Sequence, residues 1–257
     1  MSMDERQTVG LGTMGIDDPP TIETAIDLGY RHLDTAQIYD NEAVVGQGIE
    51  RSTLDRDELF VATKVWIDKL APQNVEKSTA ASLDRLGLEY ADLLYVHRPR
   101  GDYDPAETLP AFDELRERGE IEHVGVSNFT VDQLETARDH LEAPIFANQV
   151  EYHPLYQPTD ALADAQAHDS YLVAYSPLAN GRAGDIPEVV EIAEKHDVTP
   201  QAVCLAWLTA KDNLIAIPKA SSEAHLRANR DAADLTLDPE DHAAVDDIER
   251  EDEIFPE

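Results

Sequence analysis

The stretch GYRHLDTAQIYDNE, residues 29–42, holds a short apolar run that ends on a carboxylate at Asp34 and is followed five residues later by Tyr39. Two other apolar runs end in the same way: LFVATK ends on Lys64, and LLYVH ends on His97. Short apolar runs of this kind are typical of strands that are buried on both faces of a parallel sheet. The pattern predicts that an acid, a phenol, an amine and an imidazole lie at or near the ends of neighbouring strands.

Strand-like runs alternate with amphipathic helical segments along the rest of the chain. The expected strands cover residues 9–13, 30–35, 58–66, 91–97, 121–128, 144–152, 171–178 and 213–220. The expected helices cover residues 19–29, 41–52, 72–88, 105–119, 130–142, 158–170, 187–212 with a break around 197–200, 221–234 and 239–252. In the last helix, Ala243, Ala244 and Ile248 are expected to face inward. Eight strand–helix units without a Gly/Ser-rich linker predict an α/β fold, a single-domain (β/α)8 TIM barrel over residues 1–257.

A doubly wound, dinucleotide-binding sheet is the competing fold, because residues 10–15 read GLGTMG and match the pattern G-x-G-x-x-G. That fingerprint requires a helix directly after the glycines. Here the sequence IDDPP follows, at residues 16–20. We therefore expect these glycines to close a tight strand end at the mouth of the barrel.

The composition is strongly acidic: 53 Asp and Glu residues against 20 Lys and Arg residues give a formal net charge of −33. Nucleic-acid binding is disfavoured because phosphate contacts require Lys and Arg. The acidic residues are spread over many segments and do not form one tail. This distribution predicts an acidic, solvated surface suited to the salt-rich cytoplasm of a halophilic organism.

No apolar run approaches the roughly 20 residues that span a bilayer. The first residues, MSMDERQTVG, lack the basic and apolar regions of a secretory signal. We therefore expect a cytoplasmic protein with no membrane partner. The single cysteine, Cys204, lies in the apolar run AVCLAWL and is predicted to fill the core.

The four ionisable groups suit proton donation to a carbonyl group. A free phenol is a poor acid at neutral pH, and a lysine ammonium beside it lowers its pKa. Asp34 is expected to keep the amine of Lys64 protonated, so that Tyr39 acts as general acid while His97 polarises or orients the carbonyl oxygen. Singly, each residue has a simpler interpretation, such as a helix cap or an ion pair that only holds the barrel mouth together. No HxxxH, CxxC or paired-carboxylate motif accompanies them, so no metal is expected.

Several longer motifs strengthen this interpretation through a family resemblance. They are GLGT, GYRHLDTAQIYDNE, VATKVW, LLYVHRP, VGVSNF, NQVEYHP, AYSPL and IPKA. Over nearly its full length the chain resembles the aldo-keto reductase superfamily, in particular its small prokaryotic branch of the 2,5-diketo-gluconate reductase type. The resemblance implies a catalytic tetrad of Asp34, Tyr39, Lys64 and His97. It also implies an NAD(P)H-dependent oxidoreductase that reduces aldehydes or ketones to alcohols by hydride transfer.

The resemblance further implies how the cofactor is held. Ser127, Asn128 and Gln149 correspond to residues that hydrogen-bond the nicotinamide carboxamide, and Tyr175 corresponds to the aromatic residue that stacks on the nicotinamide ring. The remaining positions implied to bind the cofactor, along the pyrophosphate and at the adenosine end, are Ser176, Leu178, Lys219, Ser221, His225 and Asn229.

The adenosine end departs from the family pattern. Ala220, His225 and Ala228 stand where the family has a serine, an arginine and a glutamate. In the family that arginine pairs with the 2′-phosphate of NADPH, so the loss of its fixed fork of donors weakens the preference for NADPH over NADH. Because Lys219 is retained, NADPH remains the expected cofactor, with NADH as the alternative.

Met14, Trp66 and Arg98 stand at positions expected to line the substrate pocket. Arg98 attracts a carboxylate or polyhydroxylated substrate in one interpretation, and pairs at the rim with Asp102 or Asp104 in the other. Short loops and a short tail predict an open pocket with broad substrate choice. We expect a small-molecule carbonyl substrate and a monomeric protein.

Two other functions stay open on the sequence. Lys64 could serve as the nucleophile of a Schiff-base lyase built on the same barrel, although a neighbouring Asp34 holds its amine charged. A binding module that senses the nicotinamide nucleotide without turning it over would keep the same residues.

Overall fold

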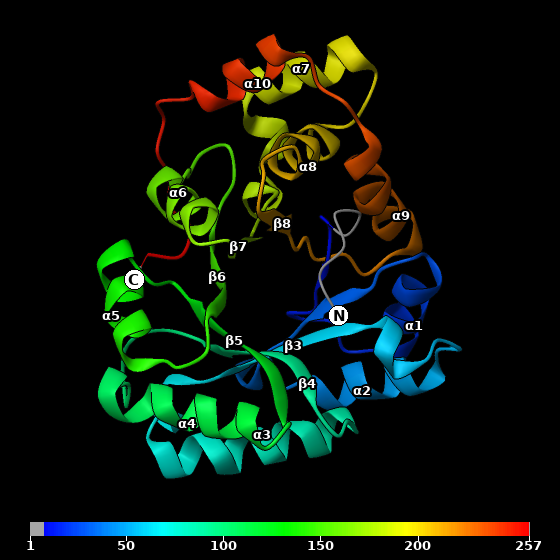
Figure 1. The fold of residues 1–257 in the computed structure, drawn as a ribbon. Helices are drawn as coiled ribbons and strands as arrows, with labels where there is room; N and C mark the ends of the chain where they lie inside the picture. The colour runs from blue at the N-terminus through cyan, green and yellow to red at the C-terminus, as the bar shows by residue number, and fades with distance from the viewer. Residues whose placement is uncertain (1–7, 257) are drawn as a thin grey trace.

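The protein is described here by a computed structural model that covers residues 8–256. Eight parallel strands form one sheet whose spatial order is the order of the sequence (Figure 1). The strands are β1 (Leu11–Gly12), β2 (His32–Asp34), β3 (Phe60–Val65), β4 (Ala91–Val96), β5 (Ile121–Ser127), β6 (Ile145–Glu151), β7 (Tyr171–Tyr175) and β8 (Leu214–Ala216). This sequential order is that of a (β/α)8 barrel and confirms the predicted fold class.

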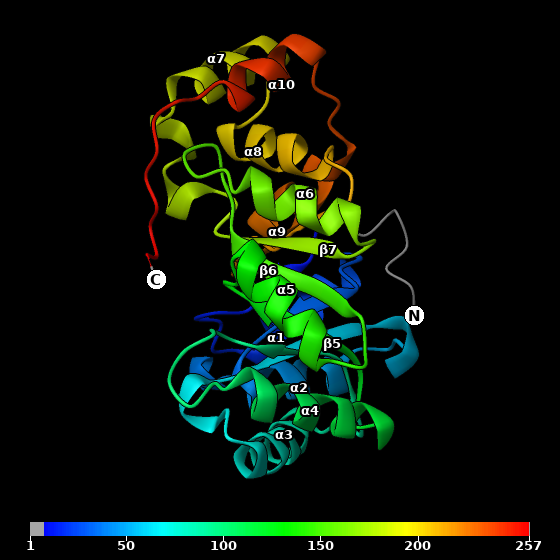
Figure 2. The same cartoon turned by 60° about the vertical axis from the view of Figure 1, so that its left-hand side comes forward.

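Helices follow the strands and surround the sheet in both views (Figures 1 and 2). They are α1 (Pro19–Asp27), α2 (Glu42–Arg51), α3 (Pro72–Leu86), α4 (Pro105–Glu117), α5 (Val131–His140), α6 (Thr159–Ala167), α7 (Pro187–His196), α8 (Pro200–Thr209), α9 (Glu223–Asp231) and α10 (Pro239–Asp246). Many of their ends carry the expected signals: Asp18 caps α1 ahead of its prolines, and Gly87 ends α3 in the left-handed conformation. The predicted break between α7 and α8 occurs at Asp197, which has a φ of 54°.

The barrel closes where β1 meets β8. The Gly10 amide donates to the Ala216 carbonyl at 2.8 Å, and the Gly12 amide donates to the Pro218 carbonyl at 3.2 Å. A Cβ atom on Gly12 would lie only 2.7 Å from the Ile217 carbonyl oxygen, so this approach requires glycine. The expectation that the GLGTMG glycines close a strand end is confirmed, because the first helix begins only at Pro19.

The core has two parts. Between the sheet and the helices lie larger apolar clusters, one of which contains Cys204 and Trp207 of α8, both without exposed surface. The inside of the barrel is filled by a smaller cluster from the inward faces of the strands: Phe60, Ala62, Leu93, Tyr95, Ala147, Val173, Ile215 and Ile217. The barrel interior is therefore packed, and its working surface is the end where the strands finish.

The C-terminal region differs from the prediction. The last helix, α10, stops at Asp246, whereas the sequence pattern extends it to residue 252. Val245 is fully buried while Ala243 and Ala244 are exposed, so the expectation that these two alanines face inward was wrong. The inward face also carries Asp241, whose carboxylate is paired with Lys195 and His196 of α7. The buried face of α10 thus carries Val245 and the paired carboxylate of Asp241, and not the two alanines.

Within residues 8–256, none of the helices combines the length and the apolar character needed to cross a bilayer. The expectation about a secretory signal rests mainly on the first seven residues, which lie outside the described part of the chain.

Candidate active site

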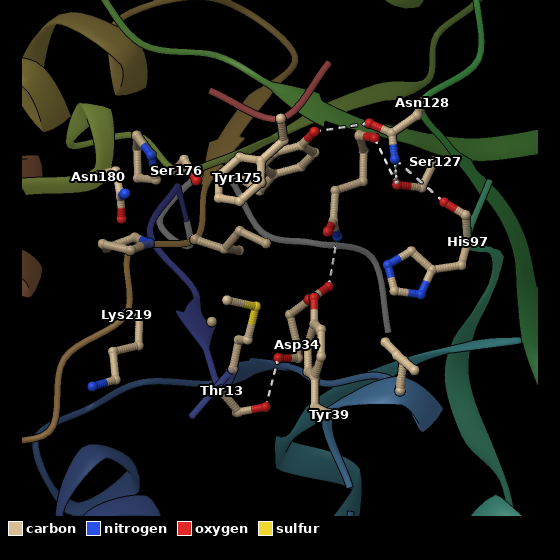
Figure 3. Close-up of a pocket in the computed structure, with 18 of the residues that line it drawn as sticks. Thr13, Asp34, Tyr39, His97, Ser127, Asn128, Tyr175, Ser176, Asn180 and Lys219 are labelled. Atoms are coloured by element: carbon tan, nitrogen blue, oxygen red, sulfur yellow. Dashed lines mark hydrogen bonds between the residues drawn. The ribbon is translucent and has the colours of Figure 1, made fainter. Parts of the chain in front are cut away.

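A cavity of about 760 Å³ opens at the carboxyl ends of the strands. Its wall brings together residues that lie in or directly after strands β1 to β8, and Figure 3 shows many of them converging on one space. The lining residues that the sequence singled out are Met14, Asp34, Tyr39, Trp66, His97, Arg98, Ser127, Asn128, Gln149, Tyr175, Ser176, Leu178 and Lys219.

Lys64 lies below this cavity and has no exposed side-chain surface. Its ammonium pairs with Asp34 Oδ1 and donates to the Thr35 carbonyl at 2.8 Å. The other oxygen of Asp34, Oδ2, accepts from Gln149 Nε2 at 2.7 Å. Burial by itself lowers the pKa of Lys64, but the Asp34 carboxylate and the Tyr39 phenol outweigh it, so the pKa is raised. The lysine is therefore charged at neutral pH.

Tyr39 ends a short 3-10 helix, Gln37–Tyr39, in the loop after β2. The ammonium nitrogen of Lys64 lies 5.2 Å from the centre of its ring. Burial raises the pKa of Tyr39, and the charge of Lys64 acts in the opposite direction without cancelling it. The lysine thus acts in the predicted direction, but the predicted net lowering of this pKa was wrong because desolvation is larger. The phenol keeps its proton at neutral pH and is available as a donor.

Two amide side chains hold the Tyr39 loop in place, and the sequence interpretation missed both. Gln37 accepts from the Trp66 amide at 3.1 Å and donates to Ser82 Oγ of α3 at 3.1 Å. Asn41 is buried and donates to the Thr13 carbonyl at 2.7 Å. Both amides flank Tyr39 in the motif AQIYDNE, and polar residues beside a candidate site residue in a loop are the signal that identifies such supports.

His97 packs its ring against two neighbours at the cavity wall. The centre of its ring lies 6.1 Å from that of Tyr39 and 4.8 Å from that of Trp66, both in edge-to-face geometry. Burial, together with the charges of Lys64 and Arg98, lowers the pKa of His97 to about 2. The imidazole is therefore neutral, and it presents an uncharged ring to the cavity.

A chain of hydrogen bonds runs along the wall opposite Tyr39 (Figure 3). Tyr175 OH donates to Asn128 Oδ1 at 3.0 Å, and Asn128 Nδ2 donates to Ser127 Oγ at 3.1 Å and to the His97 carbonyl at 3.3 Å. Ser127 Oγ donates to the Gln149 carbonyl at 2.9 Å. Asn128 has a φ of 61°, which turns its side chain toward these partners. The wall is thus a rigid arrangement of polar groups beside a half-buried aromatic ring.

The predicted adenosine-end residues are only partly brought to the cavity. Lys219 lies in the wall and donates to Ser221 Oγ at 3.4 Å, while Ser221 itself lies outside the cavity lining. His225 is exposed in the first turn of α9, where its amide donates to Ser222 Oγ. Asn229 is buried on the same helix, away from the cavity lining.

The cavity rim carries two apolar residues that the sequence interpretation did not single out. The first is Ile38, which is 47% exposed and lines the cavity with the predicted Met14, which is 58% exposed. Phe255 of the C-terminal segment also lines the cavity, and its ring centre lies 6.0 Å from that of Tyr175. The tail therefore contributes a residue to the pocket wall, which the sequence interpretation did not anticipate. No local pattern in the sequence indicates that the tail returns to the barrel mouth.

Comparison with known proteins agrees with this geometry. A family model described as "Aldo/keto reductase family" matches residues 8–250. Methylglyoxal reductase DkgB of Escherichia coli O157:H7 is 37% identical over 242 residues, which cover 92% of this chain and 90% of that protein. Glyoxal reductase of Bacillus subtilis (strain 168) is 34% identical over 251 residues, covering 96% and 90%. The crystal structure of MGS-M4, an aldo-keto reductase enzyme from a Medee basin deep-sea metagenome library, superposes with a TM-score of 0.92 at 33% identity, covering 97% of this chain and 94% of the other.

Proposed function

Because the chain belongs to the aldo/keto reductase family and is an oxidoreductase that reduces carbonyl compounds, we propose that Tyr39 is its proton donor. The observation that carries this proposal is the buried Asp34–Lys64 pair directly beneath the phenol. A fixed cation beside the phenol stabilises the phenolate that forms when the proton leaves, and so favours proton donation. Tyr39 is half-buried in the cavity wall, where a bound carbonyl oxygen can reach it.

The reaction divides between the cofactor and the protein. Reduced nicotinamide, when bound, supplies the hydride that adds to the carbonyl carbon. The C=O electron pair moves to the oxygen, which takes the proton of the Tyr39 hydroxyl. Lys64 stabilises the resulting phenolate, and Asp34 keeps the lysine charged and in place. His97 is neutral and orients the carbonyl oxygen toward the phenol.

The polar wall of the cavity suits a nicotinamide ring with its carboxamide. Ser127, Asn128 and Gln149 offer amide and hydroxyl groups in one fixed arrangement, and Tyr175 offers a flat ring beside them. Ser176, Leu178 and Lys219 continue the lining. We propose that the pyrophosphate lies along Ser176, Leu178 and Lys219. The adenosine would then extend past the cavity toward Ser221, His225 and Asn229.

NADPH is the proposed cofactor, and the support for it is the ammonium of Lys219 at the exposed end of the cavity. His225 lacks the fixed fork of donors by which an arginine binds a 2′-phosphate. We therefore propose that NADH is also accepted.

A Schiff-base lyase is disfavoured by the same geometry. A nucleophilic lysine must lose its proton and reach the substrate. Lys64 is held charged and lies entirely below the cavity surface. No feature of the cavity favours a sensor that binds the nucleotide without turnover.

The relatives suggest small carbonyl compounds as substrates, since two of them are named methylglyoxal reductase and glyoxal reductase. We propose that Met14, Trp66 and Arg98 contact the substrate at the outer part of the cavity. The cation at Arg98 should favour substrates that carry a carboxylate. Replacing it in Arg98→Gln should raise KM for a keto acid and leave KM for methylglyoxal nearly unchanged.

The direct test is to follow oxidation of NADPH and of NADH with a panel of aldehydes and ketones, at low salt and at molar salt. Turnover of aldehydes by the wild-type chain, lost in Tyr39→Phe, supports the proposal. Absence of turnover with both cofactors at either salt concentration contradicts it. The molar-salt arm also tests whether the net charge of −33 reflects a salt-rich working environment.

A further inference from the structure

The C-terminal segment returns to the mouth of the barrel after α10. In Figure 2 it runs as an extended red segment down one side of the molecule. The Asp252 amide donates to the Leu155 carbonyl at 2.8 Å, and the Asp252 carboxylate accepts from Arg182 Nη1 at 2.6 Å. The segment is therefore attached at specific points.

Its main anchor is the carboxylate of Glu151, the last residue of β6. This side chain is 2% exposed. Its Oε1 accepts the Ile254 amide at 2.7 Å, and its Oε2 accepts the Phe255 amide at 2.8 Å. Each carboxylate oxygen thus receives one backbone amide of the segment.

A buried histidine completes the anchor. His153 has no exposed surface, and its Nε2 donates to Glu151 Oε1 at 2.8 Å. Its Nδ1 accepts the Leu155 amide at 3.2 Å, which leaves the ring proton on Nε2. These contacts fix Glu151 in one rotamer. Among the described residues, its carboxylate accepts hydrogen bonds from His153 and from the amides of Ile254 and Phe255. A buried carboxylate without these donors would be costly, so the segment and the anchor hold each other.

The anchor determines where Phe255 lies. With its amide held by Glu151, Phe255 lines the cavity and its ring contacts that of Tyr175 at an interplanar angle of 70°. The other residues of the cavity wall come from the strands and from the segments that follow them. The position of Phe255 in the cavity wall thus depends on the hydrogen bond between its amide and Glu151.

We propose that Glu151 is a specificity-determining positioning residue, which seats the C-terminal segment so that Phe255 forms an apolar wall of the substrate pocket. This inference rests on the proposed function. It assigns no contact between Glu151 and substrate, since Glu151 is absent from the cavity lining. A bulky apolar group on the carbonyl compound should gain from this wall, whereas a methyl group should not reach it.

The test compares two α-oxo aldehydes that differ only in this group, phenylglyoxal and methylglyoxal. In Glu151→Gln the amide NH₂ replaces one acceptor, so one backbone amide of the segment loses its partner. We expect KM for phenylglyoxal to rise about tenfold, with kcat and the methylglyoxal constants within about twofold of wild type. Phe255→Ala should give the same pattern, and the double variant should add little to either single variant. Glu249→Gln removes an exposed acid of the same region and serves as the control.

Hydrogen exchange supplies a readout independent of turnover. The amides of Ile254 and Phe255 should be protected in the wild-type chain, and should exchange at least about tenfold faster in Glu151→Gln but not in Glu249→Gln. If Glu151→Gln does not fold, Phe255→Ala and a chain ending at Glu253 test the wall from the other side.

Unchanged exchange in a folded Glu151→Gln protein overturns the anchor. Faster exchange with an unchanged ratio of the phenylglyoxal and methylglyoxal constants overturns the specificity role, as do fully additive effects in the double variant. If the wild-type chain reduces other carbonyl compounds but neither of these aldehydes, the specificity role is overturned and the proposed function stands. If it reduces no carbonyl compound of the panel, both fail. In either case the exchange result still decides whether Glu151 holds the segment.

Discussion

Lys64 is completely buried, and its ammonium nitrogen lies 5.2 Å from the centre of the ring of Tyr39, which lines the cavity. In the proposed reaction the proton leaves the phenol, and the lysine acts by stabilising the phenolate. For this reason removal of the phenol oxygen alone should abolish proton donation while the surrounding packing survives.

Tyr39→Phe should lower kcat by a factor on the order of 10² or more, because the general acid is lost. The affinity for NADPH, followed by fluorescence titration, should stay close to wild type. Tyr90→Phe removes a phenol oxygen from a residue outside the cavity lining and should leave kcat unchanged. A Tyr39→Phe protein with near wild-type turnover would remove Tyr39 from the mechanism.

Lys64→Met should destabilise the fold by about 3–5 kcal/mol, since it leaves the Asp34 carboxylate buried without its cation. Urea unfolding measures this loss. Adding Asp34→Asn removes the stranded charge, so the double variant should be more stable than Lys64→Met while remaining inactive. Equal stability of the single and double variants would show that the charge of Asp34 is not what Lys64 supports.

Gly12→Ala should lower the melting temperature, because the new Cβ meets the Ile217 carbonyl oxygen at 2.7 Å where β1 joins β8. Overpacking of this kind costs about 1–3 kcal/mol, and backbone atoms on both sides leave little room to relax. Gly184→Ala is the matched control, since a Cβ added there would meet no atom within 4 Å beyond its chain neighbours. A Gly12→Ala protein as stable as Gly184→Ala would contradict the close approach.

Stability should depend on pH through His32, a buried residue of β2 that the proposed mechanism does not use. Burial lowers the pKa of His32 to about 4 from 6.5, an effect that the Asp34 charge reduces and the Lys64 charge increases. Between these two values the unfolded imidazole binds a proton that the folded one does not, so stability falls as pH falls.

His32→Leu removes that proton uptake. Its stability curve from pH 6.5 to 4 should be flatter than that of the wild type by up to about 1.4 kcal/mol per pH unit. Both ring nitrogens of His32 lack hydrogen-bond partners among the described residues, so replacement by leucine breaks no hydrogen bond of this side chain. Urea titrations at several pH values make the comparison. Parallel curves for the two proteins would mean that His32 does not titrate differently on folding.

The groups at the strand ends were predictable because short apolar runs in the sequence mark the strands of the barrel. Two of the apolar runs end on or beside a residue that lines the cavity, Asp34 and His97, and parallel strands place such ends on one side. Family motifs then added the Ser127, Asn128 and Gln149 wall. These features depend on residues that are close in sequence to the element that positions them.

The remaining features depend on residues that are distant in sequence. The anchor of Phe255 on Glu151 joins two segments with no shared pattern, and the phase of α10 follows from the contacts of Asp241 with α7. The pKa of Tyr39 depends on how completely the folded chain removes water from it, which spacing along the sequence does not reveal.

The junction of β1 and β8 has a consequence for synthesis on the ribosome. The ionisable groups at the ends of β2 to β4 emerge early, whereas β8 emerges after most of the chain. Until then β1 has an unpaired edge, and such edges invite pairing with other chains. Its length of only two residues limits that hazard. A nascent chain therefore carries Asp34, Lys64 and His97 well before the β1–β8 junction can form.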